Sequence, residues 1–152
     1  MALSPDNFGR HLIIDAWCTK TPEVQAVLND PIKLAEILNT CVELVGMTIL
    51  EPASIKVVPL EPDKMGSPDD DGGITGTVLL TTSHGAIHTW PLHYQFSFDL
   101  YSCRDFDGEI VVRYLVEHLG MCGGEVREMM RNHNGALKDQ ILWSSTESMR
   151  KL

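Results

Sequence analysis

The sequence predicts an α+β fold, a two-layer sandwich in which helices cover one face of an antiparallel sheet. Two observations lead to this prediction. Segments of alternating or β-branched apolar residues recur along the chain, and two stretches, 32–45 and 109–119, carry apolar residues at helical spacing instead. The resulting order of strand, helix, strands, helix and strand leaves one face of the sheet bare. We expect that face to pack against something.

The first part of the chain is predicted to form one strand and two helices. Residues 10–17 are mostly apolar and typical of a strand. The segments 22–28 and 32–45 are predicted helices, because each is preceded by a capping side chain and opens near a proline, Thr-Pro in the first and Asp-Pro in the second. Gly46 is expected to end the second helix.

The middle of the chain is predicted to be extended, with one loop. Residues 47–60 favour a half-buried strand that breaks at Pro52. Residues 61–73 are rich in Gly, Pro and Asp and are a loop by composition. Strands are predicted at 74–80 and 94–101. In the second of these, apolar and aromatic residues alternate with polar ones, so one face belongs to the core and the other could carry a site.

The last part of the chain is predicted to contain a helix at 109–119, a break at two consecutive glycines, and a short strand at 125–131. Residues 132–152 again carry apolar residues at helical spacing, so we expect a terminal helix there. The chain is therefore divided into one domain at 1–131 and a C-terminal tail at 132–152.

The amino-acid composition limits the classes of function that the chain can have. The chain has 152 residues, enough for one domain, and 43% of them are hydrophobic, as in globular proteins. No apolar run approaches the roughly 18 residues of a membrane span, and the start lacks a signal peptide, so we expect a cytoplasmic protein without a membrane partner. The four cysteines form no Cys-x-x-Cys pair, which favours free thiols. The net charge of −9 argues against nucleic acid, whose phosphates would be repelled.

The most informative segment is Thr-Thr-Ser-His-Gly-Ala-Ile-His-Thr-Trp-Pro at 81–91, followed by Cys103 twenty positions after Ser83. A second motif, Gly-Arg-His-Leu, stands at 9–12. In order and spacing, the two motifs resemble the bacterial-type S-adenosylmethionine decarboxylase proenzymes. The resemblance covers most of the chain, so 1–131 is expected to be a domain of this kind, with the tail outside it.

In that family a serine becomes the cofactor, which implies the chemistry expected of Ser83. Its hydroxyl attacks the carbonyl of Thr82, an ester replaces the peptide bond, and β-elimination cuts the chain. Hydrolysis of the resulting dehydroalanine leaves a pyruvoyl group at the new N-terminus. Such a ketone can condense with the α-amine of an amino-acid-type substrate as a Schiff base and accept the electrons released when carbon dioxide leaves. Neither an external cofactor nor a metal is required.

The resemblance also assigns roles to side chains. Cys103 is the candidate proton donor, since an unperturbed thiol with a pKa near 8.5 is still protonated at neutral pH. His88 and Thr75 match residues that assist self-cleavage. Ser83 and His88 are five positions apart and would point to opposite faces of a regular strand, so we expect a bend, which Gly85 would allow. A strained turn at the scissile bond would itself favour the acyl shift.

Substrate contacts are expected from Trp90 and Leu92. Trp90 could stack on a ligand. Leu92 stands where the family has a glutamate expected to hydrogen-bond the nucleoside, and loss of that acceptor would cost about 1.5–3 kcal/mol. The loop at 61–73 lacks an aromatic residue for adenine stacking. Thr82 replaces another family glutamate, although cleavage uses only its backbone carbonyl.

Three functions are compatible with these residues. We favour a self-processing S-adenosylmethionine decarboxylase that feeds polyamine (spermidine) synthesis. The second hypothesis keeps the pyruvoyl chemistry but decarboxylates ornithine or arginine. The third is an uncut, non-enzymatic homologue that acts as a binding or regulatory subunit.

Two further expectations concern metals and partners. Zinc binding by His84, His88 and His93 is disfavoured, because residues i and i+4 on a strand lie about 13 Å apart. In the resembling family the bare sheet face packs against a second copy, with active sites near the interface. This implies a homodimer or a higher homo-oligomer.

Overall fold

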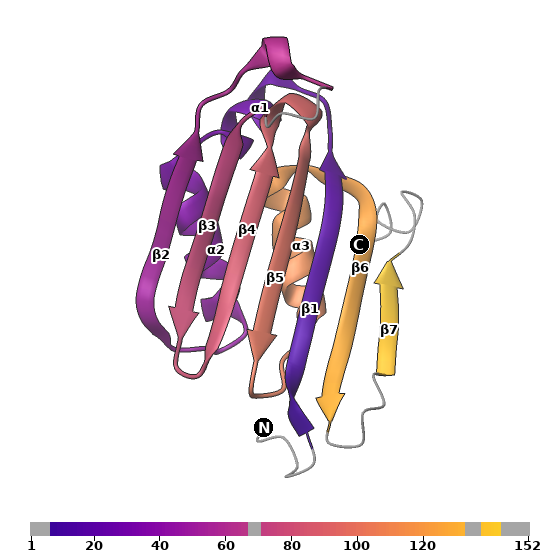
Figure 1. Ribbon diagram of the computed structural model, residues 1–152. Coiled ribbons are helices and arrows are strands. Elements are labelled where there is room, and N and C mark those ends of the chain that lie inside the picture. The colour runs from indigo at the N-terminus through magenta and orange to yellow at the C-terminus, as the bar shows by residue number, and fades with distance from the viewer. Residues whose placement is uncertain (1–6, 67–70, 133–137, 144–152) are drawn as a thin grey trace.

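The computed structural model describes residues 7–66, 71–132 and 138–143, and it confirms an α+β fold with helices on one face of an antiparallel sheet (Figure 1). The sheet order is β2-β3-β4-β5-β1-β6-β7, and every neighbouring pair is antiparallel. Among the described residues, no helix has the length and apolar character needed to cross a membrane. The strands are β1 (Asn7–Cys18), β2 (Ile49–Val58), β3 (Gly73–Leu80), β4 (Ser83–Trp90), β5 (Gln95–Ser102), β6 (Met121–Asn132) and β7 (Lys138–Trp143). The helices are α1 (Pro22–Leu28), α2 (Pro31–Leu44) and α3 (Gly108–Leu119), with 3-10 turns η1 (Pro62–Lys64) and η2 (Pro91–His93).

The helix starts agree with the sequence prediction. Thr21 Oγ1 accepts a hydrogen bond from the backbone N of Val24 at 3.3 Å, and Asp30 Oδ1 accepts two from the first turn of α2 at 2.9 and 3.0 Å. Side-chain caps of this kind contribute about 1 kcal/mol each. Gly46 follows α2 with φ +74°, where glycine has no Cβ penalty. Local signals therefore set the helix boundaries.

The core lies between the sheet and the helices α2 and α3 (Figure 1). The alternation predicted for 94–101 is confirmed, because Phe96, Phe98 and Leu100 are buried while their neighbours on the other face are not. Burying one side chain of this size contributes about 1.5–3 kcal/mol. The helices bury Leu34, Ile37, Leu38, Cys41 and Val42 from α2, and Val111, Val112, Leu115 and Leu119 from α3.

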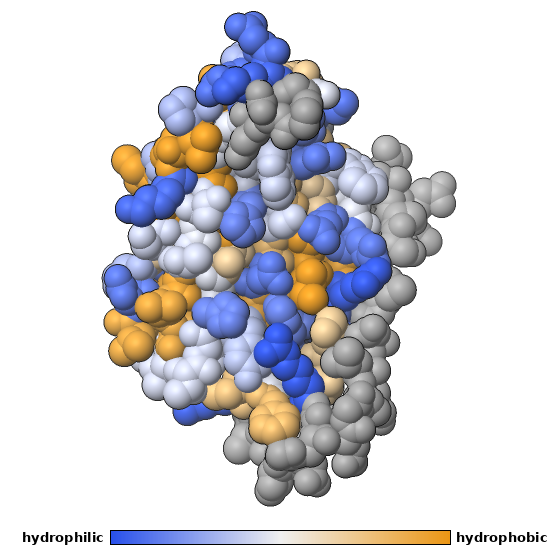
Figure 2. Space-filling model, viewed as in Figure 1, coloured by the Kyte–Doolittle hydropathy of each residue, from blue (hydrophilic) through white to orange (hydrophobic). Residues whose placement is uncertain are grey.

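The opposite face of the sheet, here called the open face, carries none of the described helices (Figure 1). Figure 2 shows it, with hydrophilic residues over the central strands and hydrophobic ones gathered toward β2. The strand register places four polar residues in one row across β3, β4, β5 and β1, namely Thr75, His88, Ser97 and Asp15. Antiparallel sheets commonly bury one face and leave the other polar.

Two expectations about strand ends are wrong. β2 does not break at Pro52, because its pairing with β3 shifts between Glu51 and Ser54 and leaves the proline in an irregularity of an edge strand. β6 begins before the two glycines and is 12 residues long. Gly124 instead permits close approach of β1, since a Cβ on it would lie 2.3 Å from the carbonyl oxygen of Asp15.

The prediction of a helix in the C-terminal tail is also wrong for residues 138–143, the part of the tail that the structure describes. Residues 138–143 form β7, which pairs with the outer edge of β6. An unpaired strand edge offers hydrogen bonds to any segment that can reach it. Helical spacing in the tail is a local signal and cannot reveal such a partner. Residues 133–137 and 144–152 lie outside the described residues.

Candidate active site

The β3–β4 hairpin forms one end of the sheet, and its loop consists of two residues, Thr81 and Thr82. Leu80 pairs with Ser83 across the loop, and the backbone N of Thr81 donates to the carbonyl of Thr48 at 3.1 Å. Thr82 has φ +64°, in the left-handed region where a β-branched residue is an outlier. This conformation costs an L-residue about 1–2 kcal/mol. The peptide bond expected to be cut therefore follows a strained residue.

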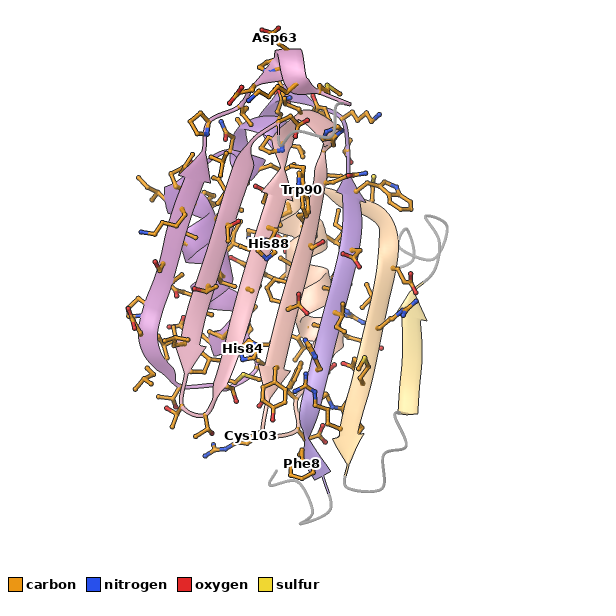
Figure 3. All side chains as sticks on the ribbon, in the orientation of Figure 1. Phe8, Asp63, His84, His88, Trp90 and Cys103 are labelled. Carbon is orange, nitrogen blue, oxygen red and sulfur yellow. The ribbon has the colours of Figure 1, made fainter. Side chains whose placement is uncertain are left out.

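Cys103 lies beside this hairpin. It follows β5 directly, at the sheet end marked by its label in Figure 3. Its backbone N donates to Ser83 Oγ at 3.1 Å, and its Sγ lies 3.0 Å from Thr82 Oγ1. The hydroxyl of Thr82 also donates to the carbonyl of Thr81 at 2.7 Å. Three residues predicted for the site, Thr82, Ser83 and Cys103, are thus brought together.

The Cys103 thiol is electrostatically unlike a buried cysteine. The hydrogen bond with Thr82 lowers the pKa of the Cys103 thiol, and slight desolvation acts against it. Burial raises the pKa of Cys18 to about 12. The Thr82 hydroxyl has one proton for two neighbours, so whenever it donates to the carbonyl of Thr81, the thiol must be the donor to Thr82 Oγ1. The contact can therefore hold Cys103 in either protonation state.

A small cavity adjoins the Ser83 hydroxyl. Its volume is about 80 Å³, far below the 300 Å³ or more of typical ligand pockets. It has room for small molecules such as water or ammonia and is too small to enclose a nucleoside. The lining residues are Gly46, Met47, Thr48, Leu80, Thr81, Ser83, Ser102, Cys103 and Arg104.

Thr75 and His88 form a second group, away from the hairpin. They are direct cross-strand neighbours on β3 and β4, and Thr75 Oγ1 lies 3.1 Å from His88 Nδ1. Both side chains are on the open face, next to a shallow pocket that also includes Trp90. The structure joins these two predicted residues to each other and does not join them to Ser83.

The bend predicted at Gly85 is wrong. β4 pairs with β3 and β5 without a register shift, so its residues alternate strictly between the two faces. Gly85 serves packing instead, since a Cβ there would lie 3.0 Å from a methyl group of Val78 and 3.5 Å from one of Leu38 on α2. Five residues of strand span about 17 Å. Ser83 and His88 of one chain therefore cannot touch.

Trp90 and Leu92 belong to the region of His88. The Trp90 ring lies 6.4 Å from the His88 ring, on the same face of β4 (Figure 3). Leu92 is half-buried in the η2 turn that follows. Both residues are therefore near the middle and far end of the sheet, and neither adjoins the hairpin of the same chain.

The open face holds another polar cluster that the sequence did not predict. His11 Nε2 lies 2.9 Å from Asp99 Oδ1, and His11 Nδ1 lies 3.1 Å from Arg131 Nη2. A guanidinium only donates, so Nδ1 accepts and Nε2 carries the proton shared with Asp99. Arg131 also lies over the Tyr101 ring, 4.5 Å from its centroid. The motif at 9–12 contained the signal, but the partners come from distant strands.

The three histidines weighed as zinc ligands do not converge. His84 and His88 are four positions apart in the regular strand β4, while His93 lies in η2 and is paired with Asp71. Within the described part of the chain, no group of three or more His, Cys, Asp or Glu side chains is placed to hold a metal ion.

Comparison with known proteins identifies one family. A family model described as S-adenosylmethionine decarboxylase matches residues 10–132. The S-adenosylmethionine decarboxylase proenzyme 2 of Halalkalibacterium halodurans is 29% identical over 127 residues, which cover 83% of this chain and 87% of that protein. The S-adenosylmethionine decarboxylase proenzyme of Geobacillus kaustophilus is 30% identical over 126 residues, which cover 83% and 89%.

A solved structure supports the same fold. The adenosylmethionine decarboxylase from Aquifex aeolicus superposes with a TM-score of 0.61 and covers 84% of this chain and 92% of that one. The two sequences are 22% identical in this superposition, so the likeness concerns the fold.

Proposed function

Because the chain belongs to the S-adenosylmethionine decarboxylase family, we propose that it is a proenzyme that cuts itself between Thr82 and Ser83 and then decarboxylates S-adenosylmethionine. One observation carries the assignment of the cut: the Ser83 hydroxyl follows the strained Thr82, and Cys103 contacts both residues. Of the three functions weighed from the sequence, this is the one that the relatives favour. Its product would supply aminopropyl groups for spermidine synthesis.

Self-cleavage requires a hydroxyl next to the preceding carbonyl. Ser83 Oγ attacks the carbonyl carbon of Thr82, the C–N bond breaks, and an ester C–O bond replaces it while the hydroxyl proton passes to the amine. A base then removes the Ser83 α-proton, and the Thr82 carboxylate departs. Addition of water releases ammonia and leaves a carbonyl on the new N-terminus. The strain at Thr82 favours the first of these steps.

The residues at the hairpin fit a pyruvoyl group formed from Ser83. Pairing of the rest of β4 with β3 and β5 holds the new N-terminus in the sheet. The backbone N–H of Cys103 donates to Ser83 Oγ in the uncut chain, and it would become a free donor beside the group once that oxygen leaves with the Thr82 carboxylate. Once formed, the group acts as an electron sink for decarboxylation. Cys103 Sγ is the acid that we assign to protonation of the substrate carbon, and in the uncut chain its contact with Thr82 holds it beside the reacting bond.

His88 and Thr75 must act from a second copy of the chain if they assist cleavage. The two residues are on the open face about 17 Å along the strand from Ser83, which rules out contact within one chain. An open polar sheet face is also a surface on which a second sheet can pack. We therefore propose a homo-oligomer, at least a dimer, in which each Ser83 meets the Thr75 and His88 pair of its neighbour.

The same argument places the substrate contacts. Trp90 and Leu92 are in the region of His88, so in such an assembly they would meet the substrate beside the neighbouring Ser83. Leu92 has no hydrogen-bond acceptor in its side chain, so the nucleoside would be held mainly by stacking and packing. Leu92→Glu should tighten S-adenosylmethionine binding.

Four further assignments complete the proposal: the domain bounds, the substrate class, the site of action and the exclusion of nucleic acid. Residues 1–131 are taken as the catalytic domain, and 132–152 as a C-terminal segment outside the family resemblance, whose described part, β7, extends the sheet. The substrate is a small amino-acid-type molecule, and the site of action is the cytoplasm. Nucleic acid is not a partner, since a net charge of −9 repels phosphates.

Intact mass and carbon dioxide release test the proposal. The purified protein should yield two fragments of 82 and 70 residues, which together make the 152 of the chain, and the second fragment should carry a carbonyl at its N-terminus. Carboxyl-labelled S-adenosylmethionine should then release carbon dioxide, whereas ornithine and arginine should not. A single uncut mass after prolonged incubation would contradict the proposal, and release from ornithine or arginine alone would replace its substrate.

A further inference from the structure

Cys103 is held in a stretch of chain without regular pairing. The segment 103–107 joins β5 to α3 and, apart from an isolated β-bridge at Arg104, has no regular strand or helical pairing. Side-chain contacts therefore help to fix its path. The hydroxyl of Ser102 accepts a hydrogen bond from the backbone N of Arg104 at 2.9 Å, and Phe106 is buried in the core. These contacts secure the segment on either side of the thiol.

A partly buried ion cluster anchors the same segment. Arg10 lies opposite Ser102 in the register of β1 and β5. Its Nη1 donates to Glu128 Oε2 at 2.8 Å, and its Nε lies 2.6 Å from Asp105 Oδ1, an ion pair without the angle of a hydrogen bond. Glu128 Oε1 accepts from the backbone N of Gly108 at 3.0 Å, the first residue of α3.

The ion cluster restricts the position of the start of α3. Glu128 is 9% exposed and sits on the core face of β6, where a carboxylate needs its partners. A Cβ on Gly108 would lie 2.0 Å from Glu128 Oε1, so the start of α3 is pressed directly against the carboxylate. The Arg10 guanidinium thus ties β1 to the middle of the segment at Asp105, and the Glu128 carboxylate ties β6 to the helix start that follows it at Gly108.

We propose that Arg10 and Glu128 are positioning residues for the Cys103 thiol, holding it where it contacts Thr82 and Ser83. The importance of this placement for turnover rests on the proposed function, in which Cys103 protonates the substrate carbon. Neither Arg10 nor Glu128 touches Ser83 or the thiol in the described contacts, so their effect passes through the backbone of 103–108.

The deciding measurement is the pH dependence of Cys103 alkylation by iodoacetamide, followed peptide by peptide with mass spectrometry. Arg10→Lys keeps the charge but loses the fork that reaches two carboxylates. Once the segment loosens, the thiol loses its hydrogen bond from Thr82, so the alkylation midpoint should rise toward the value of about 8.5 for a free thiol. Measuring wild type and Ser83→Ala backgrounds makes the result independent of cleavage.

Matched controls separate placement from stability. Arg127→Lys is the same substitution in an exposed pair with Glu125 on β6, and it should leave the Cys103 midpoint unchanged. The buried Cys18 and Cys41 report global opening, because they react only if the core unfolds. If Arg10→Lys does not fold, Asp105→Asn breaks only the tie to the segment and should raise the midpoint in the same direction.

Activity provides the second readout. In the cleaved enzyme, Arg10→Lys and Asp105→Asn should lower kcat about tenfold with little change in KM, because a misplaced acid affects the chemical step and not binding. Folded variants with wild-type midpoints and wild-type kcat would overturn the inference. A chain that never cuts but whose Cys103 midpoint still follows Arg10 would support the placement and contradict the proposed function alone.

Discussion

The hairpin end of the sheet and the middle of its open face differ in how they are assembled. At the hairpin, Thr82, Ser83 and Cys103 come from two strand ends and contact one another within a single chain. In the middle of the open face, Thr75 contacts His88, whose ring also lies 6.4 Å from that of Trp90, and neither Thr75 nor His88 contacts Ser83. In the proposed mechanism the first group supplies the nucleophile and the acid, and the second supplies the base.

The two regions also differ in backbone conformation. The hairpin loop carries its strain at Thr82, whereas Thr75 and His88 lie in ladders without irregularity. A strained peptide bond lowers the barrier to acyl shift, and a rigid ladder holds an imidazole in a fixed orientation. The proposed mechanism divides one reaction between these two regions, and neither region is complete in a monomer under that proposal.

Mixing two inactive variants tests this division and has the largest expected effect. Ser83→Ala lacks the nucleophile and His88→Ala lacks the imidazole, so each protein alone should remain uncut. Co-expressed, they can form a mixed oligomer in which an intact Ser83 faces an intact His88. Cleavage should then return, and only in the His88→Ala chain, whose C-terminal fragment is identified by its mass.

Two outcomes would break the comparison. His88→Ala that cuts itself at the wild-type rate would show that the imidazole is dispensable. Mixed oligomers that remain uncut would show that the open face of a second chain does not complete the site.

Thr75→Val, which keeps the β-branched shape but removes the hydroxyl bound to His88, serves as the milder variant and should slow cleavage without abolishing it.

Removing the thiol tests the acid in the hairpin region. Cys103→Ala should cleave normally, because the contact with Ser83 comes from the backbone N of residue 103 and survives the substitution. Decarboxylation should fall about 10²–10⁴-fold, the usual contribution of a positioned acid. Some chains should convert their cofactor to alanine, seen as a mass change of the C-terminal fragment. Unimpaired turnover without that change would assign the acid to another group.

Much of this architecture could be predicted from the sequence because its signals are local. Alternation in 94–101 predicted which residues are buried, and the Thr-Pro and Asp-Pro starts predicted α1 and α2. The bend at Gly85 could not be judged locally, since the glycine accommodates side chains of β3 and α2. β7 forms because it pairs with the outer edge of β6, and this pairing also cannot be read from the local sequence of the tail.

The candidate site divides in the same way. The motifs predicted Ser83, Cys103, His88 and Thr75 as site residues, but not which of them share a region. The cluster of Arg10 and Glu128 joins residues 118 positions apart, so neither spacing nor composition suggests it. A glutamate in phase with the buried Val126 on β6 was the one available signal.

Two substitutions at Thr82 separate strain from hydrogen bonding in the hairpin. Thr82→Gly accepts φ +64° without penalty, so it removes the stored strain of about 1–2 kcal/mol and should slow cleavage by up to about 30-fold. Thr82→Val keeps the strain and should cut at nearly the wild-type rate. It lacks the hydroxyl that lowers the pKa of Cys103, so its thiol should be alkylated more slowly near neutral pH. Equal cleavage rates for both variants would remove strain from the mechanism.

The smallest expected effect concerns the charge of Glu128, whose carboxylate binds Arg10 and the first residue of α3, next to the segment that carries Cys103. Desolvation is the main cause that raises the pKa of the Glu128 carboxyl, and the ion pair with Arg10 only partly offsets it. Between the value of about 4.3 for an exposed glutamate and the raised value, the folded protein binds more protons than the unfolded chain. The contribution of Glu128 to stability is therefore fully present below that window and decreases as pH rises through it.

Glu128→Gln removes this titration, so urea unfolding of the parent and the variant in the uncut Ser83→Ala background isolates it. The free energy of unfolding of the parent minus that of the Glu128→Gln variant should decrease as pH rises from 4.5 toward 7. Other carboxylates cancel in the difference because both proteins contain them. A difference that grows with pH would mean that Arg10 and Gly108 stabilise the ionised carboxylate by more than burial costs. The ion pair and hydrogen bonds of Glu128 would then outweigh the cost of desolvating its carboxylate.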